Sequence, residues 1–268
     1  MRVGLIGFGK TGKAVASILL ESKNFKLQWV LRRSRLLDHR SASEFLGVTS
    51  PDPGLILSSE EFDARQLFDT YPVDVVVDFS SPDGIDYYGA EAKRRKITII
   101  SAISQYPRET LESLKQLAKG TKVVHSPNIT LGINFLLIAA KILKNIAPHT
   151  DIEIIEEHFK KKPEVSGTAK VIAKQLAISE DDIKTVRAGG IIGTHEILFG
   201  FPYQTVRLKH ESIAREAFGN GILFALENLP SRKTGLYTME DLLIPYFQLA
   251  SSEAEFSARH KRPWWKLW

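Results

Sequence analysis

The sequence predicts an α/β protein with a Rossmann-like parallel-sheet domain and a second α/β domain, whose sheet is mixed and mainly antiparallel. In the first half, strand-like and helix-like segments alternate, which is the doubly wound α/β pattern. The strand-like run 73–79 is almost continuously apolar, as expected of a strand buried on both faces of a parallel sheet. In the second half, strand-like runs dominate, which favours a mainly antiparallel sheet.

The expected elements follow one another along the chain, with strands predicted from apolar runs and helices from the 3.6-residue spacing of apolar side chains. In the first half we expect strands at 3–6, 27–31, 73–79, 97–100 and 122–125, and helices at 11–22, between the strands 73–79 and 97–100, and at 108–119. In the second half we expect helices at 133–146 and 214–228, strands at 151–157, 185–188, 193–199 and 204–210, and a last element at 238–243.

Composition narrows the classes of function. The hydrophobic content of 43% is that of a globular protein, and the absence of cysteine excludes disulfides, thiolate catalysis and Cys-ligated metal. No metal site is expected. The net charge of +5 suits an anionic cofactor and substrate, and a nucleic-acid partner is not expected. With no leader-like start and no apolar run near ~20 residues, we expect a cytoplasmic protein without a membrane span.

A glycine-rich turn follows the first strand and opens the first helix. It reads Gly7-Phe8-Gly9-Lys10-Thr11-Gly12. In this context the spacing is typical of a dinucleotide site, where the glycines allow a tight turn, close approach of a pyrophosphate and close helix–strand packing. The alternative is a glycine-rich turn that binds no ligand.

The end of the second strand indicates which dinucleotide binds. An NAD-preferring site would carry an acidic residue there for the ribose hydroxyls. This chain instead has Arg32-Arg33-Ser34-Arg35, and guanidinium groups suit a 2′-phosphate. We therefore expect NADPH, with NADH possible. The alternative is an exposed basic loop.

The segment 151–169 combines three kinds of chemistry. A strand-like run leads to His158, a side chain suited to proton transfer near neutral pH. Lys162 follows four residues later and can hold a carboxylate or stabilise developing charge. Ser166-Gly167-Thr168 then opens a helix, so we expect a side-chain cap and free backbone N–H groups that attract an anion. A small acidic substrate that must be protonated would use all three.

With these motifs, the chain resembles the 4-hydroxy-tetrahydrodipicolinate (dihydrodipicolinate) reductase family of lysine and diaminopimelate biosynthesis, to about residue 243. The resemblance rests on the segments 7–12, 78–80, 128–134, 156–169, 187–196, 218–221 and 235–241. It implies NADPH-dependent reduction of a small anionic cyclic imine-type substrate by a homo-oligomer, usually a tetramer. It also implies a dinucleotide-binding domain of residues 1–127 and 215–268, to which the C-terminal segment returns, and a substrate-binding and oligomerisation domain of residues 128–214.

The resemblance also assigns roles by position. His158 and Lys162 match the catalytic residues. Phe159, Ser166, Gly167 and Thr168 match substrate-binding positions. The expected cofactor-binding positions are Gly7, Phe8, Gly9, Lys10, Thr11, Gly12, Arg32, Arg33, Phe79, Ser80, Ser101, Ala102, Ile103, Ser126, Pro127, Asn128 and Ile129.

The chain departs from the family pattern at three places. Phe159 stands where the family has a second histidine, and Ser101-Ala102-Ile103-Ser104 stands where it has Gly-Thr-Thr-Gly. The proline of the family's Pro-Ser-Gly-Thr is missing, with one residue deleted before Ser166. Phe159 and Ile103 each replace a polar group with an apolar one, so a second substrate carboxylate loses donors.

Three functions are therefore compared: a family reductase that makes tetrahydrodipicolinate, a reductase of the same fold acting on a different imine-type substrate, and a nucleotide-binding sensor or scaffold without turnover. The segment Arg259–Trp268 adds a basic tail with three of the four tryptophans. We expect these tryptophans to pack onto the protein or across an oligomer interface; a partner for the tail is unknown.

Overall fold

The computed structural model describes residues 1–232 and 234–247. It divides into two compact units, one of residues 1–129 with 218–232 and 234–247, the other Thr130–Ala217. The structural boundaries are thus 129/130 and 217/218, where the sequence predicts 127/128 and 214/215. The tail at 259–268 lies outside the described residues. No helix within the described part of the chain has the length and apolar character needed to cross a membrane.

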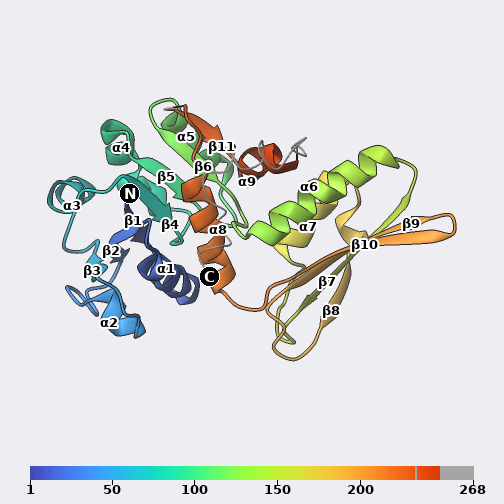
Figure 1. Cartoon of the computed structure of the whole chain (residues 1–268), viewed down its shortest axis with the longest axis horizontal. Helices are drawn as coiled ribbons and strands as arrows, with labels where there is room; N and C mark the ends of the chain where they lie inside the picture. The colour runs from blue at the N-terminus through green and yellow to red at the C-terminus, as the bar shows by residue number, and fades with distance from the viewer. Residues whose placement is uncertain (233, 248–268) are drawn as a thin grey trace. The chain divides into compact units, whose positions relative to one another are not determined.

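The first unit is built on a parallel sheet of seven strands (Figure 1). Their order is β11-β6-β5-β4-β1-β2-β3. The strands are β1 (Arg2–Ile6), β2 (Lys26–Arg32), β3 (Leu55–Ser58), β4 (Val75–Asp78), β5 (Thr98–Ser101), β6 (Lys122–His125) and β11 (Gly235–Tyr237). The helices are α1 (Lys10–Glu21), α2 (Ala42–Leu46), α3 (Ala64–Thr70), α4 (Gly84–Arg95), α5 (Arg108–Ala118), α8 (Glu216–Glu227) and α9 (Met239–Leu243), followed by the 3₁₀ turn η2 (Ile244–Phe247).

The order of these strands predicts where a ligand would bind. The chain runs from β1 through β2 to β3 on one side, then crosses to β4 on the other side of β1. Ligands of doubly wound sheets bind outside the carboxyl ends of the strands where the order reverses. In this unit that point lies beyond Ile6 of β1 and Asp78 of β4, which are paired neighbours.

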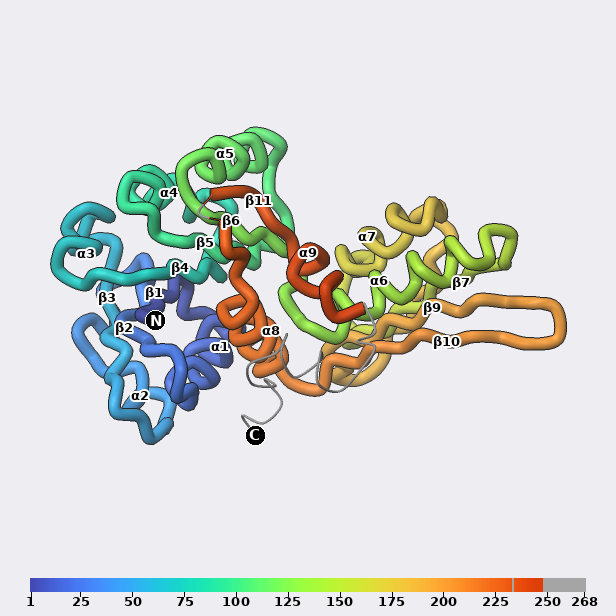
Figure 2. The backbone as a smooth tube through the Cα atoms, turned by 45° about the horizontal axis from the view of Figure 1, so that its top comes forward, coloured from blue at the N-terminus to red at the C-terminus, as the bar shows by residue number. Residues whose placement is uncertain are grey.

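The predicted α/β class is correct, and the sequence missed only short elements. Strand β4 is fully buried, as its apolar run predicts. The four-residue β3 and the seven-residue α3 were not predicted. A signal for α3 was present, because Asp63 and Gln66 form a capping box at its N-terminus. Strand β11 was also missed; it pairs with β6 and brings the C-terminal part of the chain back to this sheet (Figure 2).

The second unit is a four-stranded mixed sheet in the order β10-β9-β7-β8, with helices α6 and α7 against one face (Figure 1). Strand β9 pairs antiparallel with both neighbours, whereas β7 and β8 are parallel. The bounds are α6 (Leu131–Ile146), β7 (Asp151–His158), α7 (Gly167–Gln175), the 3₁₀ turn η1 (Glu180–Asp182), β8 (Lys184–Arg187), β9 (Thr194–Phe201) and β10 (Gln204–Glu211).

The core of this unit lies between the helices and the sheet. Side chains of a strand point alternately to its two faces. Ile154 of β7 and Ile197 and Phe199 of β9 are buried against Ile133 of α6 and Ile172 of α7. The same alternation puts Glu156, His158 and His195 on the helix-covered face. Three polar side chains are thus buried beside the core.

Candidate functional site

A cleft of about 710 Å³ opens at the switch point of the first unit. It is bounded by the segments that follow the carboxyl ends of β1, β2, β3 and β4. Its lining residues are Ile6, Gly7, Phe8, Gly9, Leu31, Arg32, Arg33, Ser34, Ser59, Ser80, Ser81, Asp83, Gly84 and Tyr87. A cleft in this position is where a dinucleotide binds in a Rossmann-like sheet.

The three glycines of the turn are needed for different reasons. Gly7 has a φ of +96°, and a Cβ there would lie 2.5 Å from the carbonyl oxygen of Phe79. A Cβ on Gly12 would overlap the carbonyl oxygen of Gly7. A Cβ on Gly9 would meet nothing within 4 Å, although Gly9 lines the cleft. Folding therefore requires Gly7 and Gly12, whereas the space beside Gly9 is available to a ligand.

Helix α1 begins at this turn without a side-chain cap on Gly9 and without an acidic residue in its first turn. Its first N–H groups and the positive end of its dipole therefore suit a phosphate. The residues at the cleft fit a dinucleotide: open space at Gly9, an uncapped helix start and a basic rim.

The basic rim includes a residue of opposite charge. Arg33 donates to Asp83 at 3.1 Å, and both side chains are exposed. Hydrogen bonding from Ser81, and the Arg33 charge, hold the pKa of Asp83 below its ordinary value. Arg32 donates to the carbonyl of Leu36 at 2.6 Å, and Arg35 donates to that of Glu60 at 3.1 Å. Arg33 is thus the guanidinium whose partner a phosphate can replace most easily, because exposed ion pairs are weak.

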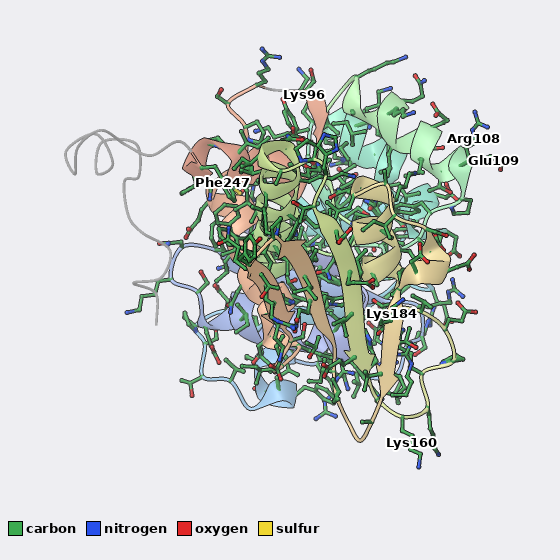
Figure 3. The ribbon with its side chains drawn as sticks, turned by 90° about the vertical axis from the view of Figure 1, so that its right-hand side faces the viewer. Lys96, Arg108, Glu109, Lys160, Lys184 and Phe247 are labelled. Carbon is green, nitrogen blue, oxygen red and sulfur yellow. The ribbon has the colours of Figure 1, made fainter. Side chains whose placement is uncertain are left out.

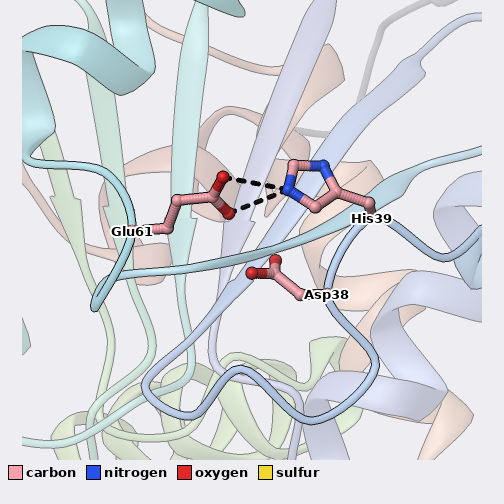
Figure 4. Close-up of side chains that lie close together, drawn as sticks. All are labelled: Asp38, His39 and Glu61. Atoms are coloured by element: carbon pink, nitrogen blue, oxygen red, sulfur yellow. Dashed lines mark hydrogen bonds and ion pairs between the residues drawn. The ribbon is translucent and has the colours of Figure 1, made fainter.

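The loop after β2 is tied to the segment after β3 by a hydrogen-bonded contact between His39 and Glu61 (Figure 4). The Nε2 atom of His39 lies 3.0 and 2.9 Å from the two carboxylate oxygens of Glu61. With Asp38 they form the one group in the described part of the chain whose ligand atoms are close enough for a metal ion. The imidazole nitrogen is already bonded to Glu61, so this contact accounts for the cluster.

The other expected cofactor residues are not brought to this cleft. Ser101, Ile103, Ser126 and Ile129 are buried, and Phe79 packs its ring against the edge of Phe218, with centroids 6.4 Å apart. None of Lys10, Thr11, Gly12, Phe79, Ser101, Ala102, Ile103, Ser126, Pro127, Asn128 and Ile129 lines it.

Eight lining residues were not among the predicted cofactor positions: Ile6 and Leu31 at strand ends, Ser34 in the arginine turn, and Ser59, Ser81, Asp83, Gly84 and Tyr87. For the last five, no motif pointed to the cleft. The available signal was their position after β3 and β4, the neighbours of β2 and β1. Because β3 was not predicted, Ser59 could not be assigned to a strand end.

The second unit buries a hydrogen-bonded group around His158. The imidazole ends β7, is 7% exposed, and donates or shares its Nδ1 proton with Glu156 two residues earlier. Glu156 is fully buried. Its other carboxylate oxygen accepts from Arg187 of β8 at 2.6 Å. The Nε2 atom of His158 has no hydrogen-bond partner among the described residues, and a Cβ on Gly193 would lie 3.0 Å from it.

Arg187 also organises the loop that carries Lys162. Its guanidinium donates to the carbonyl oxygens of Lys162 at 3.2 Å and of Glu164 at 2.9 Å. The Lys162 N–H donates to the carbonyl of Phe159 at 3.0 Å and closes a turn. Within the described residues no carboxylate pairs with the half-buried Lys162 ammonium, and its charge reaches the imidazole, since it lowers the pKa of His158. His158 and Lys162 are therefore brought together.

The expected side-chain cap at Ser166 is wrong. Ser166 is the N-cap of α7, but its hydroxyl forms no cap bond. It lies instead 2.9 Å from Nε2 of the buried His195, and the backbone N–H of Ser166 points at Glu156 at 3.4 Å. The Ser166 hydroxyl is therefore hydrogen-bonded to the buried His195 and does not cap the helix. Gly167 is exposed at the helix start, where a Cβ would meet nothing within 4 Å.

A second imidazole therefore belongs to this group. The rings of His158 and His195 meet edge to face, with centroids 5.4 Å apart. Burial, then the neighbouring His158 and His210, lower the pKa of His195 to about 3. His195 lies in a motif that carries the family resemblance, but sequence reasoning assigned it no role; its register opposite Glu156 across β7 and β9 brings it here.

Burial and charge act in opposite directions on the central pair. Burial lowers the pKa of His158, and the bond to Glu156 raises it without restoring the ordinary value. For Glu156, burial raises the pKa, but the bonds from Arg187 and His158 outweigh this and hold it below its ordinary value. Glu156 is therefore ionised and His158 neutral near neutral pH.

The remaining residues of the loop after β7 face outward. Phe159 is 43% exposed. Lys160 projects away from the sheet (Figure 3), and Lys161 is also exposed, as expected of solvated side chains. An apolar ring thus lies next to His158 in the chain at a position where the side chain is not needed for the core.

Comparison with known proteins agrees with this architecture. A family model described as the N-terminus of dihydrodipicolinate reductase matches residues 1–129, and one described as its C-terminus matches residues 129–243. The 4-hydroxy-tetrahydrodipicolinate reductase of Caldanaerobacter subterraneus subsp. tengcongensis is 35% identical over 192 residues, covering 63% of this chain and 76% of that protein. That of Lawsonia intracellularis is 32% identical and covers 88% and 96%.

A solved structure has a similar fold. Dipicolinate-bound dihydrodipicolinate reductase from Paenisporosarcina sp. TG-14 superposes with a TM-score of 0.74 at 24% identity, over 90% of this chain and 98% of that one.

The low pKa of His195 predicts a pH dependence of stability. The unfolded chain binds a proton near pH 6.5, whereas buried His195 does so only at about 3. Between these values the unfolded state binds more protons, so His195 contributes stability that is complete above 6.5 and is lost as the pH falls towards 3. Replacing it by Gln should reduce the loss by up to about 1.4 kcal/mol per pH unit. Urea unfolding of both proteins at pH 7, 6 and 5 measures this; parallel curves would contradict it.

Proposed function

This chain belongs to the 4-hydroxy-tetrahydrodipicolinate (dihydrodipicolinate) reductase family, whose members are oxidoreductases of lysine biosynthesis, and we propose that it reduces the family substrate with NADPH through His158 and Lys162. Membership makes it an NAD(P)H-dependent reductase, so the interpretation as a sensor or scaffold without turnover is set aside.

One observation carries the catalytic assignment. His158 is held through Nδ1 by a buried carboxylate and leaves Nε2 without a partner among the described residues, beside the charge of Lys162. A bound nicotinamide cofactor supplies a hydride to the imine-type carbon. The chain must then manage one proton and the negative charge of the substrate. The imidazole takes up a proton at Nε2 from solvent and donates it to the substrate, and the ammonium of Lys162 binds a carboxylate and stabilises developing charge.

The start of α7 is suited to binding one substrate carboxylate. The helix has nine residues, its N-cap side chain is engaged elsewhere, and no acidic residue stands in its first turn. Backbone N–H groups at such a helix start attract an anion. We propose that Gly167 and Thr168, with Lys162, bind one carboxylate there. Dipicolinate-type recognition is a property of the family, and at residue 159 this chain has a phenyl ring in place of a hydrogen-bond donor.

We also propose that copies of this chain associate through the face of the second sheet that α6 and α7 leave open. Ile155, Leu198 and Val186 lie on it by strand alternation, and Val186 is 43% exposed. Charged side chains of β10 surround them, such as Arg207, which pairs with Glu196. Association remains a prediction that light scattering at micromolar concentration would test, a monomer counting against it. A cytoplasmic location likewise remains an expectation, which fractionation of cells would test.

NADPH is expected to bind more tightly than NADH, because Arg33 can exchange Asp83 for a 2′-phosphate. Arg33→Ala should weaken NADPH binding by roughly 10–100-fold, the value of a charge-assisted hydrogen bond of about 1.5–3 kcal/mol. It should change NADH binding little. Asp83→Asn should act in the opposite direction, since it frees the guanidinium. Fluorescence titration of both cofactors with the three proteins, at one salt concentration, measures this. Wild-type protein that prefers NADH would refute the preference.

His158→Ala and Lys162→Ala are each expected to remove most turnover while cofactor binding is kept. A general acid contributes roughly 10²–10⁴-fold in rate, and loss of the ammonium leaves the substrate charge unbalanced. Single-turnover absorbance of NADPH oxidation on the family substrate separates chemistry from binding. Lys160→Ala, in the same loop but pointing outward, is the matched control. A near-normal rate in either variant would remove that residue from the mechanism.

The family dicarboxylate is expected to be turned over more slowly than a donor at residue 159 would allow, because Phe159 offers no donor. Because residue 159 is exposed, Phe159→His can be made as a single substitution without disturbing the core. It should raise kcat/KM. Adding Ile103→Thr completes the reversion but places a hydroxyl at a buried position, which costs about 1–3 kcal/mol if it finds no partner. Stability is therefore measured alongside. Fast wild-type turnover that neither reversion improves would show that both departures are harmless.

A further inference from the structure

We propose that Glu156 is the positioning residue of the proton-transfer site: it fixes the orientation of His158 and, through Arg187 and Ser166, holds the Lys162 loop and the start of α7 to the same point. This inference rests on the proposed roles of His158 and Lys162. Glu156 itself is placed away from the substrate, because it is fully buried.

The contacts of Glu156 connect three separate segments. One carboxylate oxygen is bonded to Nδ1 of His158 in β7. The other accepts from Arg187 of β8 at 2.6 Å and faces the backbone N–H of Ser166 before α7 at 3.4 Å. A buried carboxylate is costly unless its charge is paired and its lone pairs are bonded, and here both conditions are met. The three segments therefore share one buried anion.

The charge of Glu156 also decides which nitrogen of His158 reacts. An ionised carboxylate can only accept hydrogen bonds, so Nδ1 must carry a proton. Neutral His158 then has its lone pair on Nε2, the nitrogen without a partner among the described residues. The neighbouring Gly193 leaves room there, since a Cβ would come within 3.0 Å of Nε2. Proton exchange at Nε2 thus depends on a carboxylate on the other side of the ring.

Arg187 completes the arrangement from the far side of the carboxylate. It balances the charge of Glu156 and donates to the carbonyl oxygens of Lys162 and Glu164. The charged or titratable groups that face His158 are therefore Glu156 on its own strand, Arg187 on β8, His195 on β9 and Lys162 in the following loop. Only Glu156 favours the protonated imidazole.

The substitution Glu156→Gln tests the proposal, because it keeps the volume and removes the charge. Arg187 should retain the amide oxygen, so the amide NH₂ group turns to His158 and donates to Nδ1. The proton of neutral His158 then moves to Nε2, and the imidazolium from which His158 gives a proton to the substrate loses the carboxylate that stabilises it. We expect the hydride-transfer rate to fall by roughly 10–10³-fold, with the KM for substrate and the affinity for NADPH changed less than threefold.

Nitrogen-15 NMR reports the tautomer and the pKa of His158, and a purely structural role of Glu156 would change neither. In the substrate-free full chain, wild-type His158 should be the Nδ1–H tautomer and Glu156→Gln the Nε2–H tautomer. The pKa of His158 should fall in Glu156→Gln and rise in Arg187→Met, because the two charges act on it in opposite directions. Glu157→Gln removes a carboxylate from the next position, on the opposite face of β7, and should leave rate, tautomer and pKa unchanged.

The possible outcomes separate this inference from the proposed function. An Nε2–H tautomer in wild-type protein would overturn the inference without any variant having to fold. So would a normal rate, tautomer and pKa in folded Glu156→Gln. A fully active His158→Ala would overturn the proposed function instead, and with it the catalytic half of the inference. The tautomer of His158, and the opposite shifts of its pKa in Glu156→Gln and Arg187→Met, would still test whether Glu156 positions the imidazole.

Discussion

The second unit is organised around one buried negative charge. Glu156 lies between an imidazole and a guanidinium, and each partner is attached to a different segment of the proposed site. Because an unpaired charge in such a position is strongly destabilising, the fold itself selects the arrangement in which His158, Arg187 and Ser166 converge. The geometry of the site is therefore a consequence of folding and does not have to be assembled by the ligand.

The two sheets provide two different kinds of site. The parallel sheet of the first unit creates its cleft by topology, at the place where strand order reverses, and the residues that line it come from turns after the strands. The mixed sheet of the second unit presents its chemistry on neighbouring strands, with His158 on β7, Arg187 on β8 and His195 on β9. The first site is therefore built from turns at strand ends, and the second from side chains on adjacent strands.

The sequence could predict what depends on local pattern. Alternation of apolar segments indicated the α/β class, the glycine spacing indicated the dinucleotide turn, and the positions of His158 and Lys162 indicated a proton-transfer site. Pairing across strands could not be predicted in the same way. Glu156, Arg187 and His195 are brought together by register, and Asp83 meets Arg33 across a cleft between segments about fifty residues apart in the chain. The cap expected at Ser166 failed for this reason, because a distant imidazole competes for its hydroxyl.

The three glycines of the nucleotide turn are under unequal constraint. Gly7 and Gly12 are enforced by this chain's own backbone, whether or not a cofactor binds. Nothing in the described part of the chain occupies the space beside Gly9. In a descendant that no longer bound dinucleotides, Gly9 would therefore be the first of the three glycines to be substituted, whereas Gly7 and Gly12 would be retained. The middle glycine, rather than the whole motif, marks a chain that still binds its cofactor.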